Sequence, residues 1–124
     1  CATNFVANID SAVLRPGRFD LVIPIGPPDL TARRSLWAAA LATLDQEKVD
    51  IDALARATEG YTPGDVELAA QRAAAKAFDR IRAGVEPANI TLDDLFQSIA
   101  RTPGSVTPQI RENFAAEVSR FARV

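Results

Sequence analysis

The chain has 124 residues, of which 48% are apolar and 24% are charged, which is enough for one modest hydrophobic core. Its net charge of −2 at pH 7 argues against a nonspecific nucleic-acid binder, which usually carries a strongly basic face. The single cysteine and the lack of histidine exclude an internal disulfide, a structural zinc site and a Ser-His-Asp triad within the chain. Because the sequence contains no methionine, we expect it to be an internal or C-terminal part of a larger protein.

The first 28 residues differ in composition from the rest and hold four of the eight prolines. Within them, the apolar run at residues 21–25 is typical of a short β-strand, and Gly-Pro-Pro at 26–28 closes it. Residues 29–124 instead show helical periodicity. Asp29 is a candidate cap for a helix to about Leu44, and Asp50 or Asp52 can start a short helix that ends before Gly60.

The longest predicted helix begins at Thr62 and Pro63, which are favoured at the cap and at the first helical position, and runs to about Ala83, with Gly84 as its stop. Its apolar stripe is mostly alanine, so a neighbouring helix can approach closely. The stripe consists of Val66, Ala69, Ala70, Ala73, Ala77 and Ile81.

Two more helices follow, one capped by Thr91 and one beginning at residues 107–108, with a linker at 101–105 between them. Their apolar faces contain Leu92, Leu95, Phe96 and Ile99, and then Ile110, Phe114, Val118 and Phe121.

Among single residues, we expect Trp37 to be core, and Arg33 and Arg34 to lie on a solvated face. The adjacent acids Asp93 and Asp94 point about 100° apart on a helix, so we assign them to the helix dipole rather than to a metal.

The N-terminal segment contains several closely spaced polar and charged residues that are candidates for a binding or catalytic role. Ala-Thr-Asn at 2–4 ends with Asn4, Ile9 and Asp10 follow, and residues 14–20 read Leu-Arg-Pro-Gly-Arg-Phe-Asp. Arg15 and Arg18 flank a stiff Pro-Gly turn, which can present both guanidinium groups on one side. Such planar, permanently charged donors suit phosphate. Taken alone, such a turn is more often a solvated loop.

This stretch, together with Pro28-Asp29, resembles the second region of homology of the AAA ATPases in residue order and spacing. The resemblance implies that Asn4 is the sensor-1 asparagine near the γ-phosphate. It implies that Arg15 and Arg18 occupy arginine-finger positions, which reach the ATP of a neighbouring subunit. Asp10 and Asp20 are interpreted as structural residues that fix the loop.

A second resemblance lies in Gly-Tyr-Thr-Pro-Gly-Asp-Val at residues 60–66, which is similar to the Gly-Phe-Ser-Gly-Ala-Asp-Leu segment of the AAA helical lid. In the family, the backbone of that segment approaches adenine. The resemblance therefore implies cofactor-binding roles for Gly60, Tyr61, Pro63 and Gly64, although Pro63 replaces the usual glycine and removes one backbone N–H. From local chemistry alone, a capped helix start is the simpler interpretation.

The expected fold is mainly α: a four- or five-helix AAA+ lid at residues 29–124, preceded by a strand-containing remnant of the αβ nucleotide-binding subdomain at 1–28. The resemblance implies a parent protein that hydrolyses ATP with Mg²⁺ in a ring, expected to be a hexamer, in the cytoplasm.

The sequence contains no Gly-x-x-x-x-Gly-Lys-Ser/Thr phosphate loop and no strand ending in paired acids. We therefore expect the 124-residue chain to be inactive alone and to hold neither nucleotide nor metal tightly. No nucleic-acid partner or membrane segment is expected, and the protein substrate is unknown. The alternative is a helical protein-interaction domain without a nucleotide function.

Overall fold

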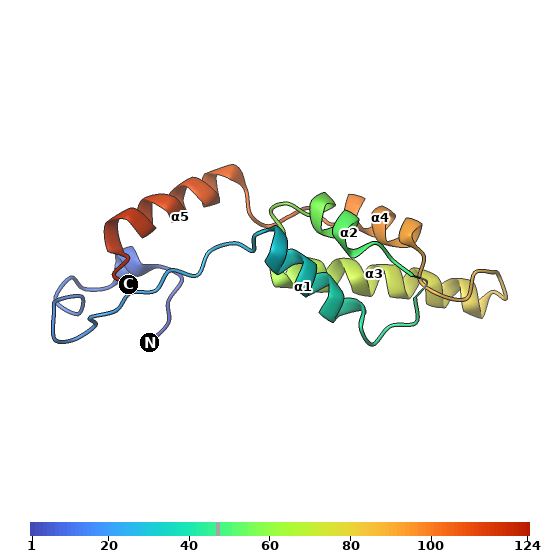
Figure 1. The fold of residues 1–124 in the computed structure, drawn as a ribbon, viewed down its shortest axis with the longest axis horizontal. Helices are drawn as coiled ribbons and strands as arrows, with labels where there is room; N and C mark the ends of the chain where they lie inside the picture. Colours follow the sequence, from blue (N-terminus) through green and yellow to red (C-terminus); the bar gives the residue numbers. More distant parts are fainter. Residues whose placement is uncertain (47) are drawn as a thin grey trace. The chain divides into compact units, whose positions relative to one another are not determined.

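The computed structural model describes residues 1–46 and 48–124, which form two compact units. One unit contains residues 27–106, and the other contains residues 1–26 together with 107–124. The larger unit consists of four helices: α1 (Leu30–Leu41), α2 (Ile51–Ala57), α3 (Pro63–Arg82) and α4 (Leu92–Ala100) (Figure 1). The smaller unit contains the short 3₁₀ helix η1 (Val6–Asn8) and α5 (Pro108–Phe121).

The predicted helix starts are confirmed. Before each α-helix, a side-chain oxygen accepts a hydrogen bond from a backbone N–H of the first turn, which otherwise has no partner. The capping residues are Asp29, Asp50, Thr62, Thr91 and Thr107. Two helix ends differ slightly from prediction, since α1 stops at Leu41 rather than near Leu44 and α3 stops one residue early at Arg82.

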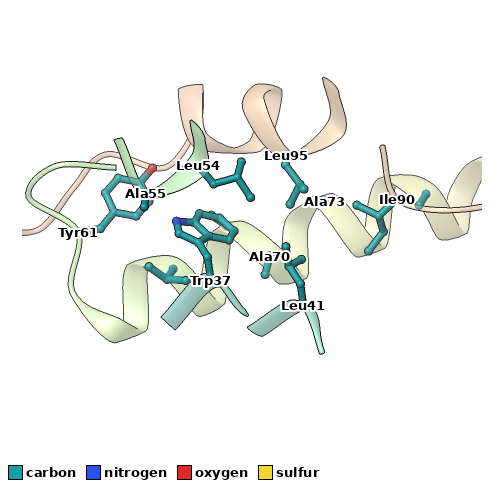
Figure 2. Close-up of a cluster of buried hydrophobic side chains, with 12 residues drawn as sticks. Trp37, Leu41, Leu54, Ala55, Tyr61, Ala70, Ala73, Ile90 and Leu95 are labelled. Carbon is teal, nitrogen blue, oxygen red and sulfur yellow. The ribbon is translucent and has the colours of Figure 1, made fainter. Parts of the chain in front are cut away.

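The core of the larger unit is built around Trp37 of α1, which is fully buried as predicted. Figure 2 shows Trp37 at the centre of the cluster, between Leu54 of α2 on one side and Ala70 of α3 on the other. The Trp37 indole N–H donates to the Thr58 hydroxyl at 3.0 Å, so its polar atom is satisfied. Five of the six predicted stripe residues of α3 are buried, and these small side chains let α1 and α4 pack closely on α3.

Two expectations about the larger unit are wrong. Ile81 is 49% exposed, because it belongs to the last turn of α3, beyond the buried stripe that ends at Ala77. Arg33 is buried rather than solvated. Its guanidinium donates to the carbonyl oxygens of Ala55 and Pro28, both at 2.9 Å, so it links α1 to α2 and to the chain entering α1. Arg34 does lie at the surface, paired with Asp52.

The run at residues 21–25 does not form the expected strand. Val22 makes one isolated antiparallel bridge with Arg123, with two backbone hydrogen bonds of 3.0 Å. The ladder cannot continue through the next hydrogen-bonded position, since Pro24 has no N–H and the opposing residue Phe121 is helical. Leu21 and Ile23 remain largely exposed.

The helix α5 contributes to the smaller unit, whereas the sequence analysis grouped it with the other helices. Its Phe114 ring lies against Gly26, where a Cβ atom would come within 2.7 Å of the ring. The C-terminal Arg123 forms the bridge to Val22. The mainly helical fold class is confirmed, while the functional division at residue 28 stays a prediction. In the described part of the chain, no helix is both long and apolar enough to cross a membrane.

Candidate functional site

The turn that carries Arg15 and Arg18 is held by its own backbone and by two carboxylates. Arg18 N–H donates to the Arg15 carbonyl at 3.2 Å, and Gly17 has a φ of 86°, which glycine adopts without strain. Asp20 accepts a hydrogen bond from Gly17 N–H at 2.6 Å, and Asp10 accepts one from Ala12 N–H at 2.9 Å. The predicted structural roles of the two aspartates are thus confirmed, and the turn has a defined shape.

The two arginines of this turn differ in how they are held. The Arg18 guanidinium donates to the Ala12 carbonyl at 3.0 Å, which ties it back to the loop. Arg15 is exposed, and its guanidinium has no hydrogen-bond or ion-pair partner among residues 1–46 and 48–124. Arg15 is therefore the side chain that is available for an external anion, with Arg18 bracing the turn beside it.

Asn4 is exposed at the tip of a short turn in which the Thr3 hydroxyl accepts a hydrogen bond from Phe5 N–H at 3.1 Å. Its side-chain amide has no partner within the described part of the chain. Asn4 lines a hollow of the smaller unit together with apolar side chains such as Leu21 and Phe114, whereas Arg15 and Arg18 do not. The structure thus brings the two arginines together on one turn and leaves Asn4 apart from them.

Of the four residues predicted to bind the cofactor, Gly60 and Tyr61 lie in the loop between α2 and α3, and Pro63 and Gly64 begin α3. Gly60 has a φ of 82°, and its carbonyl accepts a hydrogen bond from Val106 N–H at 3.0 Å. Tyr61 is buried, with its hydroxyl at hydrogen-bond distance from the carbonyls of Ile99 and Thr102. Burial raises the pKa of Tyr61, so the hydroxyl stays protonated as a donor.

Pro63 and Gly64 form the first turn of α3, whose N-terminal N–H groups carry partial positive charge. Gly64 is exposed there, so its backbone is open to a ligand that approaches the loop. The side of the loop that bears Tyr61, by contrast, faces the protein. A ligand at this loop would therefore contact backbone atoms of residues 62–64 rather than the Tyr61 ring.

The role of Asp65, at the start of α3, was not predicted from the sequence. Its carboxylate accepts hydrogen bonds from the N–H of Thr62 at 2.8 Å and from the N–H and hydroxyl of Ser105 at 2.9 and 2.6 Å. Burial alone would raise the pKa of Asp65, but these hydrogen bonds outweigh it and lower the pKa. The signal was present in the sequence, because Thr62 and Asp65 have the spacing of a capping box.

A second carboxylate, Asp94, is also more than a helix-dipole residue. It is buried at the start of α4, accepts a hydrogen bond from the Thr91 N–H at 3.0 Å, and accepts two hydrogen bonds of 2.6 Å from the Arg80 guanidinium. Chiefly because of Arg80, the pKa of Asp94 is held well below its usual range. This pair links the C-terminal half of α3 to α4. Among the described residues, no group of three His, Cys, Asp or Glu side chains could hold a metal ion.

Comparison with known proteins identifies the family. Residues 48–92 match the family model of the AAA+ lid domain. The chain is 37% identical over 114 residues to the ATPase family gene 2 protein of Saccharomyces cerevisiae, an alignment that covers 88% of this chain and 14% of that protein. It is 33% identical over 126 residues to the ATP-dependent zinc metalloprotease FtsH 1 of Salinibacter ruber, covering 99% of this chain and 18% of that protein. The chain belongs to the AAA ATPase family.

The fold agrees with this AAA membership. The solved FIGL-1 AAA domain in complex with ADP superimposes with a TM-score of 0.83 at 20% identity, over 99% of this chain and 44% of that chain. The four-helix unit at residues 27–106 contains the matched AAA lid segment. The chain spans less than a fifth of the length of the two AAA relatives named above.

Proposed function

We propose that this chain supplies two parts of the ATP site in an AAA ATPase: the lid side of its own nucleotide site and the arginine finger for a neighbouring subunit. In this proposal the intact protein hydrolyses ATP with Mg²⁺ in a ring, expected to be a hexamer, and the 124 residues alone do not. The proposal includes the cytoplasmic location that the sequence resemblance implies.

The observation that carries the proposal is Arg15, whose guanidinium has no partner among the residues that the structure describes, on a turn fixed by Asp10, Asp20 and Arg18. A guanidinium that acts on a phosphoryl group must already be oriented, because ordering it at the moment of reaction would cost conformational entropy. The hydrogen bonds of Asp10 and Asp20 fix the backbone from which Arg15 extends, which restricts the positions that its guanidinium can reach. Arg33 differs in this respect, because it is buried and its guanidinium is held by two carbonyl oxygens within the fold.

The residues present fit a nucleotide on the lid side. The first turn of α3 offers exposed backbone at Gly64 and the positive end of a helix, and Pro63 leaves one fewer N–H donor than glycine would. When bound, Mg²⁺ would neutralise phosphate charge. The described residues contain no group of three His, Cys, Asp or Glu side chains that could hold it alone. Asn4, whose side-chain amide has no partner in the described part of the chain, can orient a water or a phosphate oxygen.

The experiment that tests this proposal uses the intact protein with Asn4→Ala. We expect kcat for ATP hydrolysis to fall about 10²-fold, in line with the loss of one positioned polar group, while the Kd for a fluorescent ADP analogue stays unchanged. Asn8→Ala, an exposed asparagine of the same segment, is the matched control and should leave both values unchanged. An Asn4→Ala protein with wild-type kcat, or an intact protein without ATPase activity, would contradict the proposal.

A further inference from the structure

We propose that Ser105 and Asp65 form a clamp that positions the nucleotide-facing loop at residues 60–64. This inference rests on the proposed function, since it assigns the loop its orientation toward a bound nucleotide. Residues 101–105 were expected to be a linker. In the structure they are instead joined to the loop, and Thr102 is 2% exposed.

The backbone of the loop and the backbone of residues 104–106 are in direct contact. A Cβ atom at Gly60 would lie 2.9 Å from the Val106 carbonyl oxygen, and one at Gly104 would lie 2.8 Å from the Gly60 carbonyl oxygen. Both distances are too short for any side chain. Glycine at both positions therefore permits the Val106 N–H to reach the Gly60 carbonyl.

The Asp65 carboxylate connects the two segments through charge-assisted hydrogen bonds. One of its oxygens accepts the Ser105 hydroxyl, and the other accepts the N–H groups of both Ser105 and Thr62. The Thr62 hydroxyl in turn accepts the Asp65 N–H at 3.2 Å. A single carboxylate therefore fixes the start of α3 and residue 105 at once.

Two further contacts support the clamp from within the fold. The Tyr61 hydroxyl bonds the carbonyls of Ile99 and Thr102, at the end of α4. The Arg72 guanidinium donates to the Arg101 carbonyl at 2.8 Å and to the Thr102 hydroxyl at 2.9 Å. Residues 99–106 are thus tied to α3 and to the preceding loop along their whole length. The clamp holds the loop from its protein-facing side and leaves Gly64 open on the other.

Ser105 is a positioning residue in this account, because its hydroxyl acts on the loop through Asp65 and does not itself contact the nucleotide. Ser105→Ala removes the hydroxyl donor but keeps the backbone N–H. Since Ser105 is exposed, the change leaves no cavity in the core. Ser105→Thr retains the hydroxyl and should rescue the clamp. Ser35→Ala is the matched control, since Ser35 is an exposed serine whose hydroxyl bonds only the Thr31 carbonyl of its own helix.

The test has two measurements. In the 124-residue chain, hydrogen exchange at the amides of Thr62, Ser105 and Val106 should speed up about tenfold in Ser105→Ala, as expected for one lost hydrogen bond to a charged group. Exchange at Ala73 in the core should not change. In the intact protein, the Kd of a fluorescent ADP analogue should rise by up to about tenfold in Ser105→Ala and stay at the wild-type value in the other two variants.

The outcomes separate this inference from the function on which it rests. Faster exchange with an unchanged Kd would overturn the positioning role while leaving the nucleotide site in place. Unchanged exchange in Ser105→Ala would show that there is no clamp. An intact wild-type protein that fails to bind the ADP analogue would overturn the proposed function, and the positioning role with it, whatever the exchange rates show.

Discussion

Replacing Arg15 with alanine is expected to lower kcat for ATP hydrolysis by the intact protein by a factor of about 10³ or more, the range that arginine fingers contribute in other NTPases. The physical reason is that charge develops on the phosphoryl oxygens in the transition state, where the exposed Arg15 guanidinium can neutralise it. Steady-state ATPase assays on the intact protein measure this effect. The Kd for ADP should change little, because the interaction strengthens in the transition state.

Three further variants test whether the loss of activity comes from the Arg15 guanidinium and from the turn that carries it. Arg15→Lys keeps the charge but loses the planar fork of donors, so we expect most of the activity to stay lost. Arg34→Ala removes an exposed arginine of the other unit and should leave kcat unchanged. Arg18→Ala should also reduce kcat, because it releases the turn from the Ala12 carbonyl. A loss of less than about threefold in Arg15→Ala would refute the finger assignment, since that is far below the range for such residues.

Trp37→Ala is expected to destabilise the four-helix unit by about 3–5 kcal/mol, the usual cost of deleting a large buried aromatic side chain. Trp37 has no exposed surface and belongs to the buried core cluster, so truncation leaves a cavity that small neighbours such as Ala70 cannot fill. Urea unfolding of the 124-residue chain, followed by circular dichroism, measures the change in the free energy of unfolding.

Control variants distinguish the effect of losing the Trp37 side-chain volume from the effect of losing its hydrogen bond. Trp37→Phe keeps most of the apolar volume but loses the indole donor to Thr58, so we expect a cost of about 1–2 kcal/mol. Phe78→Ala truncates an aromatic residue that is 58% exposed and should cost less than either core variant. Equal destabilisation by Trp37→Ala and Phe78→Ala would contradict the assignment of Trp37 as the centre of the core.

The helices could be predicted from the sequence because their signals are local. A capping oxygen, a proline at the first helical position and a glycine after the last turn act within a few residues of each helix end. Thr62, Pro63 and Gly84 therefore predicted the extent of α3 to within one residue. The alanine stripe likewise predicted which face of α3 is buried, except at Ile81, where the helix extends past its neighbours.

The features that could not be predicted depend on contacts between distant residues. The partners of Arg33 and Asp94, and the bonds between Asp65 and Ser105, each require knowing which segments the fold brings together. The prediction of a strand at residues 21–25 was wrong for the same reason, because an apolar run does not supply a pairing partner. For the candidate site, the spacing of Arg15 and Arg18 indicated a shared turn, but only the structure distinguishes the unpaired Arg15 from the braced Arg18.

The central claim is that Arg15 acts on the ATP of a neighbouring subunit while Asn4 acts on the ATP of its own. The most direct test mixes two inactive variants of the intact protein, Asn4→Ala and Arg15→Ala, under conditions that allow subunits to exchange. Roughly a quarter of the wild-type activity should return in a 1:1 mixture. Half of the sites then have an intact Asn4, and half of those face an intact Arg15 across a head-to-tail ring interface. No recovery in mixed assemblies would contradict the claim, because it would mean that both residues serve the same subunit's site.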